Sequence, residues 1–293
     1  MLKRAANGLS IVVALLVLCV VPIAGCSWPS TASYEDATLP LASQLITEAP
    51  DRVLLVTGEY APYTTEDPNN QGFFSQIVEE VFRNADMAVD VEFYPWPRCQ
   101  QMVADGEVFA MFPYSFVPDN SDAYLQSDPV VRTDFRLFYR TDNPKITEEI
   151  READDLGHLK GLVVAGSGGY WYGSKEELED LGLTVEWANG RDAMFKMLQS
   201  GRVDFVIEDA LVGRNTLARL FPMHAEEYDT LSSLEFDRNY YLMVSRDYPD
   251  AQAMLKRFNQ SLGELRRNGR VGEILDEYGI VAERAEPWET NVP

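Results

Sequence analysis

Strand-like and helix-like patterns alternate along this chain from residue 52 onward, and this alternation constrains the fold more than any other feature of the sequence. The run RVLLVTG (52–58) is typical of a buried strand that ends at a glycine, and GFFSQIVEEVFRNA (72–85) carries its apolar residues at helical spacing. The same order recurs where the apolar run LVVAG (162–166) precedes the helical pattern SKEELEDLG (174–182). Strands that alternate with helices favour parallel sheets covered by helices, so we predict an α/β fold.

Two segments with the same layout indicate that the fold has two similar halves. MVADGEVFAMF (102–112) and MLQSGRVDFVI (197–207) place methionine, an aliphatic residue, glycine and valine in register. In each segment the glycine ends a helix pattern and a strand pattern follows, as at a helix C-terminus. We therefore predict two α/β lobes.

The last part of the chain indicates how the lobes are connected. The strand pattern at 239–249 leads into two helix patterns, at 251–269 and 270–279, that have no partner in the second half. We expect these helices to return to the first lobe, so that the chain crosses between the lobes twice, near 141–145 and near 234–240. A cleft between two lobes is the usual place for a small ligand.

The first residues have the features of a lipoprotein signal peptide. Lys3 and Arg4 precede an apolar run (11–23) that is shorter than the ~20 residues a spanning helix needs. IAGC, which ends at Cys26, resembles the bacterial lipobox, in which the cysteine is acylated, so Cys26 is the predicted lipidation site. An ordinary signal peptide with a cysteine near its cleavage site is the alternative. We expect the chain to be exported and lipid-anchored, on the periplasmic or another extracytoplasmic face of a membrane.

The composition limits the partners and cofactors of the chain. A formal net charge of −22 argues against nucleic acid as a partner. With Cys19 in the signal peptide and Cys26 lipidated, Cys99 is the remaining thiol, and the two histidines, His158 and His224, have no metal-ligand spacing with it. We therefore expect no metal or other cofactor, and we expect Cys99 to be buried.

These features divide the chain into parts. Residues 27–50 are rich in Ser, Thr, Ala and Pro without periodicity, which is typical of a flexible spacer. The predicted organisation is a signal peptide at 1–25, the spacer at 26–50, a first lobe at 51–141 and 240–285, a second lobe at 142–239 and a C-terminal tail at 286–293.

Five segments carry a resemblance to a known family. In order, they are TGEYAPYTTED (57–67), GEVFAMFPYSFVPDNSDAYLQSDP (106–129), GLVVAGSGGYWYG (161–173), GRVDFVIEDALVG (201–213) and NGRVGEILDEYG (268–279). From about residue 52 to residue 281 the chain resembles the family 3 extracellular solute-binding proteins, the bacterial polar-amino-acid binders of ABC importers. The resemblance implies a periplasmic-binding-protein-like fold, in which two α/β lobes joined by two hinge crossings close on a ligand in the cleft between them.

The resemblance also implies ligand contacts in the first lobe. Tyr60 matches an aromatic residue that stacks on the ligand, with Tyr63 nearby, and Ser115 matches a position that supplies a hydroxyl group. Asn120 stands where the family has an arginine that clamps the carboxylate of the ligand. Because asparagine can donate a hydrogen bond but cannot neutralise a carboxylate, this side of an amino-acid site is altered.

In the second lobe, the glycine-rich turn GSGGYWYG (166–173) lacks the spacing of a phosphate-binding loop. The resemblance makes it the turn that faces the cleft, with Tyr170 and Trp171 at positions where the family has hydroxyl side chains, and Tyr172 is expected to pack beneath it. Asp209 matches the family aspartate that accepts the α-ammonium group of the ligand.

Trp96, Arg98 and Tyr114 complete the predicted ligand-binding site. YPWPRC (94–99) puts Trp96 and Arg98 at the start of a helix that borders the cleft. There Arg98 either faces inward and supplies the missing positive charge, or lies on the surface. Opposite the glycine-rich turn, Tyr114 would complete an aromatic cage suited to a ring or an alkylated cation.

These features imply a binding protein rather than an enzyme. The predicted function is extracytoplasmic capture of a small solute, an amino acid or a related amine, by a monomer that delivers it to the membrane permease of an ABC importer. Two alternatives stay open. One is a cleft enzyme of the cyclic-acid dehydratase type with Glu208 or Asp209 as the acid, and the other is a module that reports a ligand to a membrane receptor.

Overall fold

The structure is a computed structural model that describes residues 52–115, 124–166, 175–180, 182–281 and 284. These residues all fall within one unit of the chain, Thr47–Pro293. The predicted signal peptide, the lipidation site Cys26, the spacer and the C-terminal tail lie outside the described residues.

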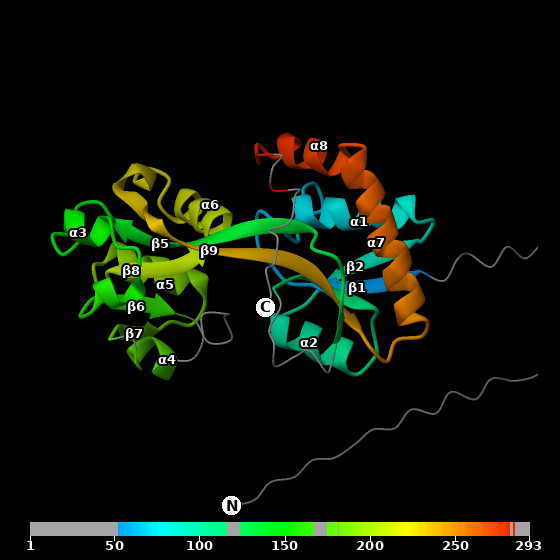
Figure 1. Ribbon diagram of the computed structural model, residues 1–293, viewed down its shortest axis with the longest axis horizontal. Helices are drawn as coiled ribbons and strands as arrows, with labels where there is room; N and C mark the ends of the chain where they lie inside the picture. Colours follow the sequence, from blue (N-terminus) through cyan, green and yellow to red (C-terminus); the bar gives the residue numbers. More distant parts are fainter. Residues whose placement is uncertain (1–51, 116–123, 167–174, 181, 282–283, 285–293) are drawn as a thin grey trace, which may run out of the picture. The chain divides into compact units, whose positions relative to one another are not determined.

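Within the described residues, nine strands form a sheet in the order β2-β1-β3-β9-β5-β8-β6-β7, with β4 paired to β9 (Figure 1). The strands are β1 (Val53–Thr57), β2 (Val89–Phe93), β3 (Ala110–Tyr114), β4 (Tyr124–Gln126), β5 (Val131–Arg140), β6 (Val163–Gly166), β7 (Thr184–Trp187), β8 (Phe205–Asp209) and β9 (Tyr228–Ser245). β1 runs parallel to β2 and β3, and β6 runs parallel to β7 and β8. The two parallel groups are joined by β5 and β9, which are antiparallel to their neighbours. The α/β class predicted from the alternation of patterns is thus confirmed.

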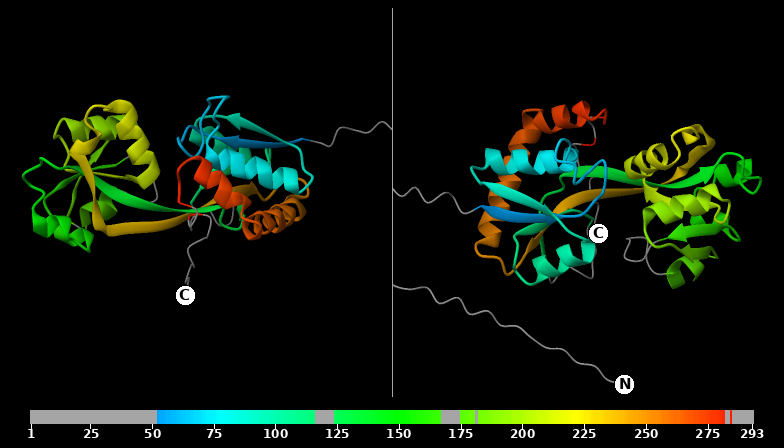
Figure 2. Two further views of the ribbon diagram at one scale, coloured as in Figure 1. Left: turned by 90° about the horizontal axis from the view of Figure 1, so that it is seen from above. Right: turned by 180° about the vertical axis from the view of Figure 1, so that it is seen from behind.

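Helices cover both groups of strands (Figure 2). They are α1 (Phe73–Asn84), α2 (Trp96–Ala104), α3 (Glu148–Arg151), α4 (Lys175–Asp180), α5 (Arg191–Gln199), α6 (Ala210–Leu220), α7 (Ala251–Arg267) and α8 (Arg270–Glu277), with short 3-10 turns at Leu156–Leu159 and Ala225–Glu227. α1, α7 and α8 pack against one another, whereas α5 and α6 pack together beside β5 and β8. In the described part of the chain, the helices are all too short or too polar to span a bilayer.

The amphipathic pattern of the first helix accounts for its place in the fold. Phe74, Ile77, Val78, Val81 and Phe82 recur at helical spacing, and all five side chains are fully buried. They belong to a hydrophobic core that also includes residues of α7 and α8. The end of the chain is therefore held beside its first helix by burial of apolar surface.

Strands β5 and β9 each pass from one hydrophobic core to another, which divides the molecule into two lobes. At the start of β5, Val131 and Phe135 belong to the core of α1, α7 and α8, whereas Leu137 belongs to the core around β6 and β7. On β9, Leu234 belongs to this second core and Tyr240 to the first. We call the part around the first core lobe 1 and the part around β6 and β7 lobe 2. The paired strands β5 and β9 connect them.

Close packing between α6 and β5 depends on a glycine. An added Cβ atom at Gly213 would lie 2.3 Å from Cζ of Phe138, whose ring is buried and stacks edge-on against Phe195. Although alanine is the better helix former, we expect Gly213→Ala to lower the free energy of unfolding by about 1 kcal/mol, because the buried ring has little room to move. Urea unfolding monitored by circular dichroism measures this change.

The same substitution in α7 provides a matched control. A Cβ atom at Gly263 would meet Nη1 of Arg267 at 3.2 Å, and this end of an exposed side chain can move aside. Gly263→Ala should therefore raise the free energy of unfolding by about 0.5–1 kcal/mol through helix propensity. Equal effects of the two substitutions would contradict the close packing of α6 on Phe138.

Candidate functional site

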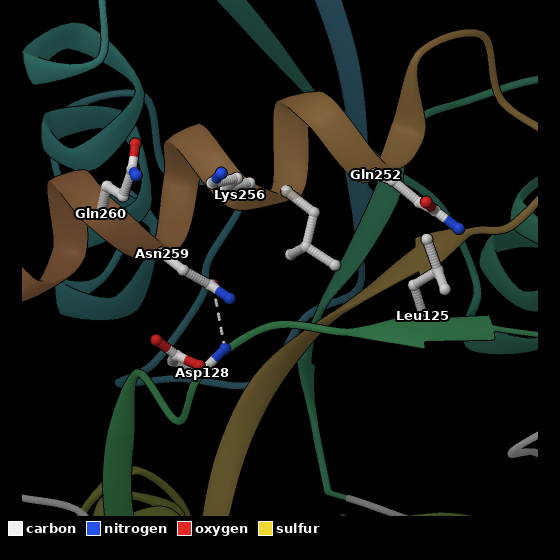
Figure 3. A pocket seen from close by; sticks show the side chains of 7 residues that line it. Leu125, Asp128, Gln252, Lys256, Asn259 and Gln260 are labelled. Carbon is white, nitrogen blue, oxygen red and sulfur yellow. Dashed lines mark hydrogen bonds between the residues drawn. The ribbon is translucent and has the colours of Figure 1, made fainter.

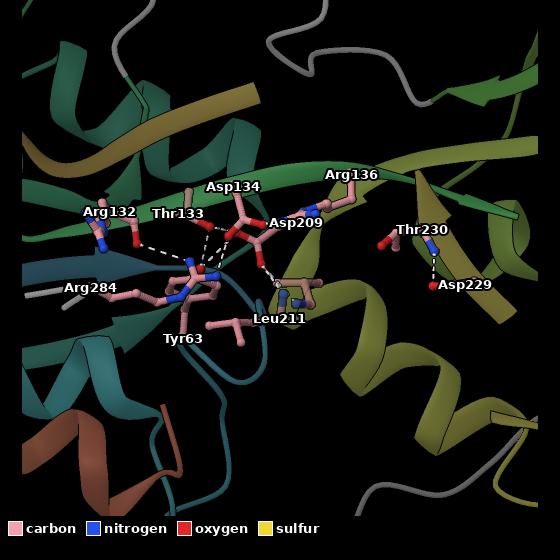
Figure 4. Close-up of polar contacts among 11 residues, drawn as sticks. Tyr63, Arg132, Thr133, Asp134, Arg136, Asp209, Leu211, Asp229, Thr230 and Arg284 are labelled. Atoms are coloured by element: carbon pink, nitrogen blue, oxygen red, sulfur yellow. Dashed lines mark hydrogen bonds and ion pairs between the residues drawn. The ribbon is translucent and has the colours of Figure 1, made fainter. Parts of the chain in front are cut away.

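A carboxylate at the end of β8 joins residues from both lobes. Oδ2 of Asp209 lies 2.8 Å from the hydroxyl of Tyr63, which comes from the turn after β1, and it accepts a hydrogen bond from Thr133 on β5 (Figure 4). The Tyr63 hydroxyl also lies 2.8 Å from Oγ1 of Thr133. The three side chains thus form a closed polar cluster where lobe 1, lobe 2 and a connecting strand meet.

Asp209 has this position because it also caps a helix. Its Oδ1 accepts hydrogen bonds from the backbone N–H groups of Leu211 (2.9 Å) and Val212 (3.0 Å), the first turn of α6. An aspartate at the N-cap satisfies backbone donors that the helix cannot pair internally. The side chain is fully buried, and both of its oxygens have donors within the protein.

Burial decides the protonation behaviour of Asp209. It raises the pKa of this carboxyl group from 3.8 to about 6, although the hydrogen bonds from Thr133, Val212 and Tyr63 act in the opposite direction. Among the described residues, no arginine or lysine forms a direct ion pair with Asp209, although Arg284 lies near enough to interact with its charge.

Glu208, the neighbour of Asp209 on β8, is fully buried as well and has a different set of partners. Its Oε2 accepts a hydrogen bond from Nε of Arg191 at 2.8 Å, and its Oε1 accepts one from the backbone N–H of Asp209 at 2.9 Å. The hydroxyl of Tyr60 lies 3.4 Å from the same Oε1. Glu208 is therefore held as one half of an ion pair.

The aromatic side chains predicted in lobe 1 are brought together around Tyr60. The Tyr60 ring stacks on Tyr63 with centroids 5.5 Å apart and meets Trp96 edge-on at 6.3 Å, and Trp96 in turn contacts Tyr114 at 6.0 Å. Gly58 permits this approach, because a Cβ atom there would lie 2.7 Å from Cε2 of Trp96. Two members of the cluster, Tyr60 and Tyr63, are buried and lie beside the two buried carboxylates.

Tyr240 on β9 is a member of this cluster that the sequence did not reveal. Its ring packs edge-on against Tyr60 (6.0 Å) and Tyr63 (5.1 Å), and its hydroxyl lies 2.9 Å from that of Tyr60. Burial raises the pKa of all three phenols well above the ordinary value. They therefore remain protonated hydrogen-bond donors.

Two arginines that the sequence did not single out neutralise carboxylates at this junction. Besides the pair of Arg191 with Glu208, Arg284 reaches Asp134 on β5 and lies near Tyr63 (Figure 4). Burial opposes the ionisation of Asp134, but hydrogen bonds from Arg136 and Arg284 hold its pKa below the ordinary value. No spacing rule connects these arginines with their partners, which are distant in sequence or lie on another element.

Other predicted site residues lie apart from the cluster or outside the described residues. Arg98 forms an ion pair with Glu107 (2.9 Å), and about half of each side chain is exposed. This is the surface position of Arg98 that the sequence analysis left open as an alternative. Ser115 lies directly after β3 and is half-buried. Asn120, Tyr170, Trp171 and Cys26 lie outside the described residues.

Neither a reactive thiol nor a metal site is found in the described part of the chain. Cys99 is buried, and burial raises the pKa of its thiol to about 11, so the reactive thiolate is disfavoured. No group of three or more His, Cys, Asp and Glu side chains in that part could hold a metal ion.

A separate groove of about 480 Å³ lies on lobe 1, between α7 and the turn after β4 (Figure 3). It is lined by Leu125, Asp128, Gln252, Leu255, Lys256, Asn259 and Gln260. Asn259 accepts a hydrogen bond from the backbone N–H of Asp128 at 2.9 Å and so fixes this turn. None of the lining residues is buried, so the groove lacks the enclosed polar groups that orient a small ligand.

The two lobes, the paired connecting strands and the cluster between the lobes define a ligand-binding protein of the two-lobe type. Residues 53–280 match the model of the bacterial extracellular solute-binding proteins, family 3, and the chain belongs to this family. The family resemblance noted in the sequence is thus confirmed. No curated protein sequence matches the chain significantly.

Solved structures share the fold at low sequence identity. The GluR0 ligand-binding core from Nostoc punctiforme in complex with L-glutamate is 18% identical, with a TM-score of 0.61 over 77% of this chain and 98% of that chain. The arginine-, lysine-, histidine-binding protein ArtJ from Geobacillus stearothermophilus is 17% identical, with a TM-score of 0.62 over 80% and 99% of the two chains. A histidine kinase sensor domain with similarity to periplasmic binding proteins is 18% identical, with a TM-score of 0.64 over 80% and 99%.

The raised pKa of Asp209 has a measurable consequence for stability. The folded-state pKa of Asp209 lies above 3.8, the ordinary value that applies to the unfolded chain, so the folded protein binds the proton more tightly. The stability that this group contributes is therefore fully present below pH 3.8 and is lost as the pH rises through 6. In Asp209→Asn the group cannot ionise. Between pH 4 and pH 7 the free energy of unfolding of the wild type should therefore fall relative to this variant by about 2 kcal/mol.

Urea unfolding of both proteins at several pH values measures this difference. Asparagine can accept the backbone hydrogen bonds of α6 through its oxygen and donate to the Tyr63 and Thr133 hydroxyls, so the variant should fold. A difference that does not change between pH 4 and pH 7 would contradict the raised pKa.

Proposed function

We propose that this protein captures a small solute, an amino acid or a related amine, between its lobes and delivers it to the membrane permease of an ABC importer. The observation that carries the proposal is Asp209, a fully buried carboxylate at the junction of the lobes that has hydrogen-bond donors but no ion-pair partner among the described residues. An ammonium group would provide the opposite charge that this carboxylate lacks.

The contact of Tyr63 with Asp209 explains how a ligand would reach this group. Tyr63 comes from lobe 1, whereas Asp209 begins α6 in lobe 2. When the lobes separate, the Tyr63 hydroxyl leaves Oδ2, and a ligand ammonium can take its place. Closure of two lobes on a ligand about a pair of connecting strands is an established type of domain motion.

The aromatic surface of lobe 1 would form the other wall of the cleft. Trp96 already contacts both Tyr60 and Tyr114 there, and aromatic walls with few polar groups are usual in ligand sites. Ser115, Asn120, Tyr170 and Trp171 complete the proposed set of contacts, following the family resemblance.

The cellular setting is part of the same proposal. The sequence supports export, a lipid anchor at Cys26 and a position on the periplasmic or other extracytoplasmic face, with the protein acting as a monomer. The proposed lobes comprise 51–141 with 240–285 and 142–239. An anchor would keep the binder close to its permease.

A ligand-sensing role is the second candidate. The similarity of the fold to a histidine kinase sensor domain supports it. Deletion of the gene for this protein should reduce cellular uptake of the bound solute if the protein serves transport. Unchanged uptake together with altered phosphorylation of a membrane kinase would favour sensing.

Binding of amines and amino acids tests the proposal. We expect one member of a panel of amino acids and amines to raise the melting temperature of the purified protein, because a ligand that binds the native state alone stabilises it. Trp96→Ala and Asp209→Asn should each weaken the affinity for that ligand at least about tenfold, which corresponds to about 1.4 kcal/mol. Isothermal titration calorimetry gives the dissociation constants.

Glu186→Gln serves as the control, because Glu186 forms an exposed ion pair with Arg202 on lobe 2. The affinity of the Glu186→Gln variant for the ligand should equal that of the wild type. Tight binding of an anion without an amine, unaffected by Asp209→Asn, would exclude the proposed role of Asp209.

A further inference from the structure

Arg191 of lobe 2 lies against the aromatic residue of lobe 1 that the family resemblance assigns to the ligand. It is the first residue of α5 and follows Gly190, whose φ of 86° turns the chain into the helix. Its guanidinium carbon lies 4.7 Å from the centre of the Tyr60 ring, and its Nε donates to Oε2 of Glu208 at 2.8 Å. The side chain is 18% exposed. A cation of the protein thus occupies the space between an aromatic face and a buried carboxylate.

These two groups together have the chemistry of a cation-binding site. The face of a tyrosine ring attracts a guanidinium group within about 6 Å of its centroid. A carboxylate pairs with the same group through charge-assisted hydrogen bonds, and planar guanidinium suits both contacts at once. A guanidinium ligand from solution would need the position that Arg191 fills.

Burial makes this position difficult to vacate. Glu208 is fully buried, and its second oxygen accepts from the Asp209 N–H. Removal of the cation from a buried carboxylate strongly destabilises the folded protein, so Arg191 stays beside Glu208 unless another cation replaces it. A ligand with a cationic side chain would therefore compete with a group that is covalently part of the protein.

We propose that Arg191 determines ligand specificity by occupying the Tyr60 face and the Glu208 carboxylate, so that ligands with a cationic side chain are excluded from the cleft. The inference rests on the proposed function, because it takes the Tyr60 face as part of the ligand site. The ligand then carries its amine toward Asp209 and a neutral or acidic side chain toward Arg191, since like charges at close range repel.

Chemical rescue of Arg191→Ala tests this assignment without any amino acid. The probe is methylguanidinium, which has the planar cation of arginine but neither an amine nor a carboxylate, and sodium chloride at equal ionic strength is the reference. Arg191→Ala should melt below the wild type, and methylguanidinium should bind this variant at least tenfold more tightly than the wild type and restore part of the lost melting temperature. NMR titration gives the affinities and a thermal-shift assay gives the melting temperatures.

Three further variants make the test specific. In Arg191→Ala/Glu208→Gln the carboxylate is absent, so the gain in methylguanidinium binding should disappear. Arg202→Ala removes the arginine of an exposed ion pair with Glu186 in the same lobe and should show no gain. Arg191→Gln retains a hydrogen-bond donor toward Glu208 and is the substitute if Arg191→Ala does not fold. It should bind methylguanidinium more tightly than the wild type does, by a smaller factor than expected for Arg191→Ala.

Equal binding of methylguanidinium by the wild type and the foldable Arg191 variant would overturn the inference. If the wild type nevertheless binds an amino acid, the proposed function stands and the inference alone fails. The same variants should lower the ratio of the dissociation constants of arginine and its neutral analogue citrulline at least tenfold. A gain in methylguanidinium binding without any amino-acid or amine binding by the wild type would support the inference and count against the proposed function.

Discussion

The junction between the lobes depends on the burial of two successive carboxylates at the end of β8. Glu208 and Asp209 are both fully buried, although a charge without compensation is costly inside a protein. Adjacent residues of a strand point to opposite faces, so one set of partners cannot serve both groups. The protein supplies two sets: a guanidinium group for Glu208, and hydroxyl and helix N–H donors for Asp209.

The two solutions have different consequences when the lobes move. The Glu208 carboxylate and the Arg191 guanidinium both belong to lobe 2, so their pair can survive separation of the lobes. Asp209, in contrast, receives one donor from Tyr63 of lobe 1. If the lobes separated, this donor would be lost and the carboxylate would be exposed to water, and hydration would favour its ionised form. The pKa near 6 belongs to the arrangement in the structure, in which burial of the carboxylate outweighs the hydrogen bond from Tyr63.

The fold could be predicted from the sequence because its signals are local. Apolar periodicity identified α1 and the parallel strands, and the repeated segments around Gly106 and Gly201 indicated two lobes. The length of β5 and β9 was not predicted, because polar residues such as Asp237 interrupt the apolar pattern where a strand leaves one core for the other. Pairing between such strands depends on contacts that no short window contains.

The candidate site was predictable only where the family resemblance or a helix signal applied. Tyr60, Trp96 and Tyr114 were each predicted to line the cleft, and in the structure Trp96 contacts both tyrosines. Asp209 directly precedes the apolar helix pattern of α6, so its capping role could have been recognised from the usual N-cap signal. Arg191 carried no signal of its own, since a charged residue at the start of a helix is ordinarily exposed. The role proposed for it rests on a tertiary contact with Tyr60.

The charges at the junction favour one class of ligand within the proposed function. Carboxylates and guanidinium groups meet there, among them Glu208, Asp209, Asp134, Arg191, Arg136 and Arg284. Within the described residues Asp209 has no direct ion pair, so negative charge remains local to it. A zwitterion adds no net charge to such a set and can place its ammonium at Asp209. A dication would place its second positive charge near these arginines, in a region of low dielectric where Coulomb repulsion is strong.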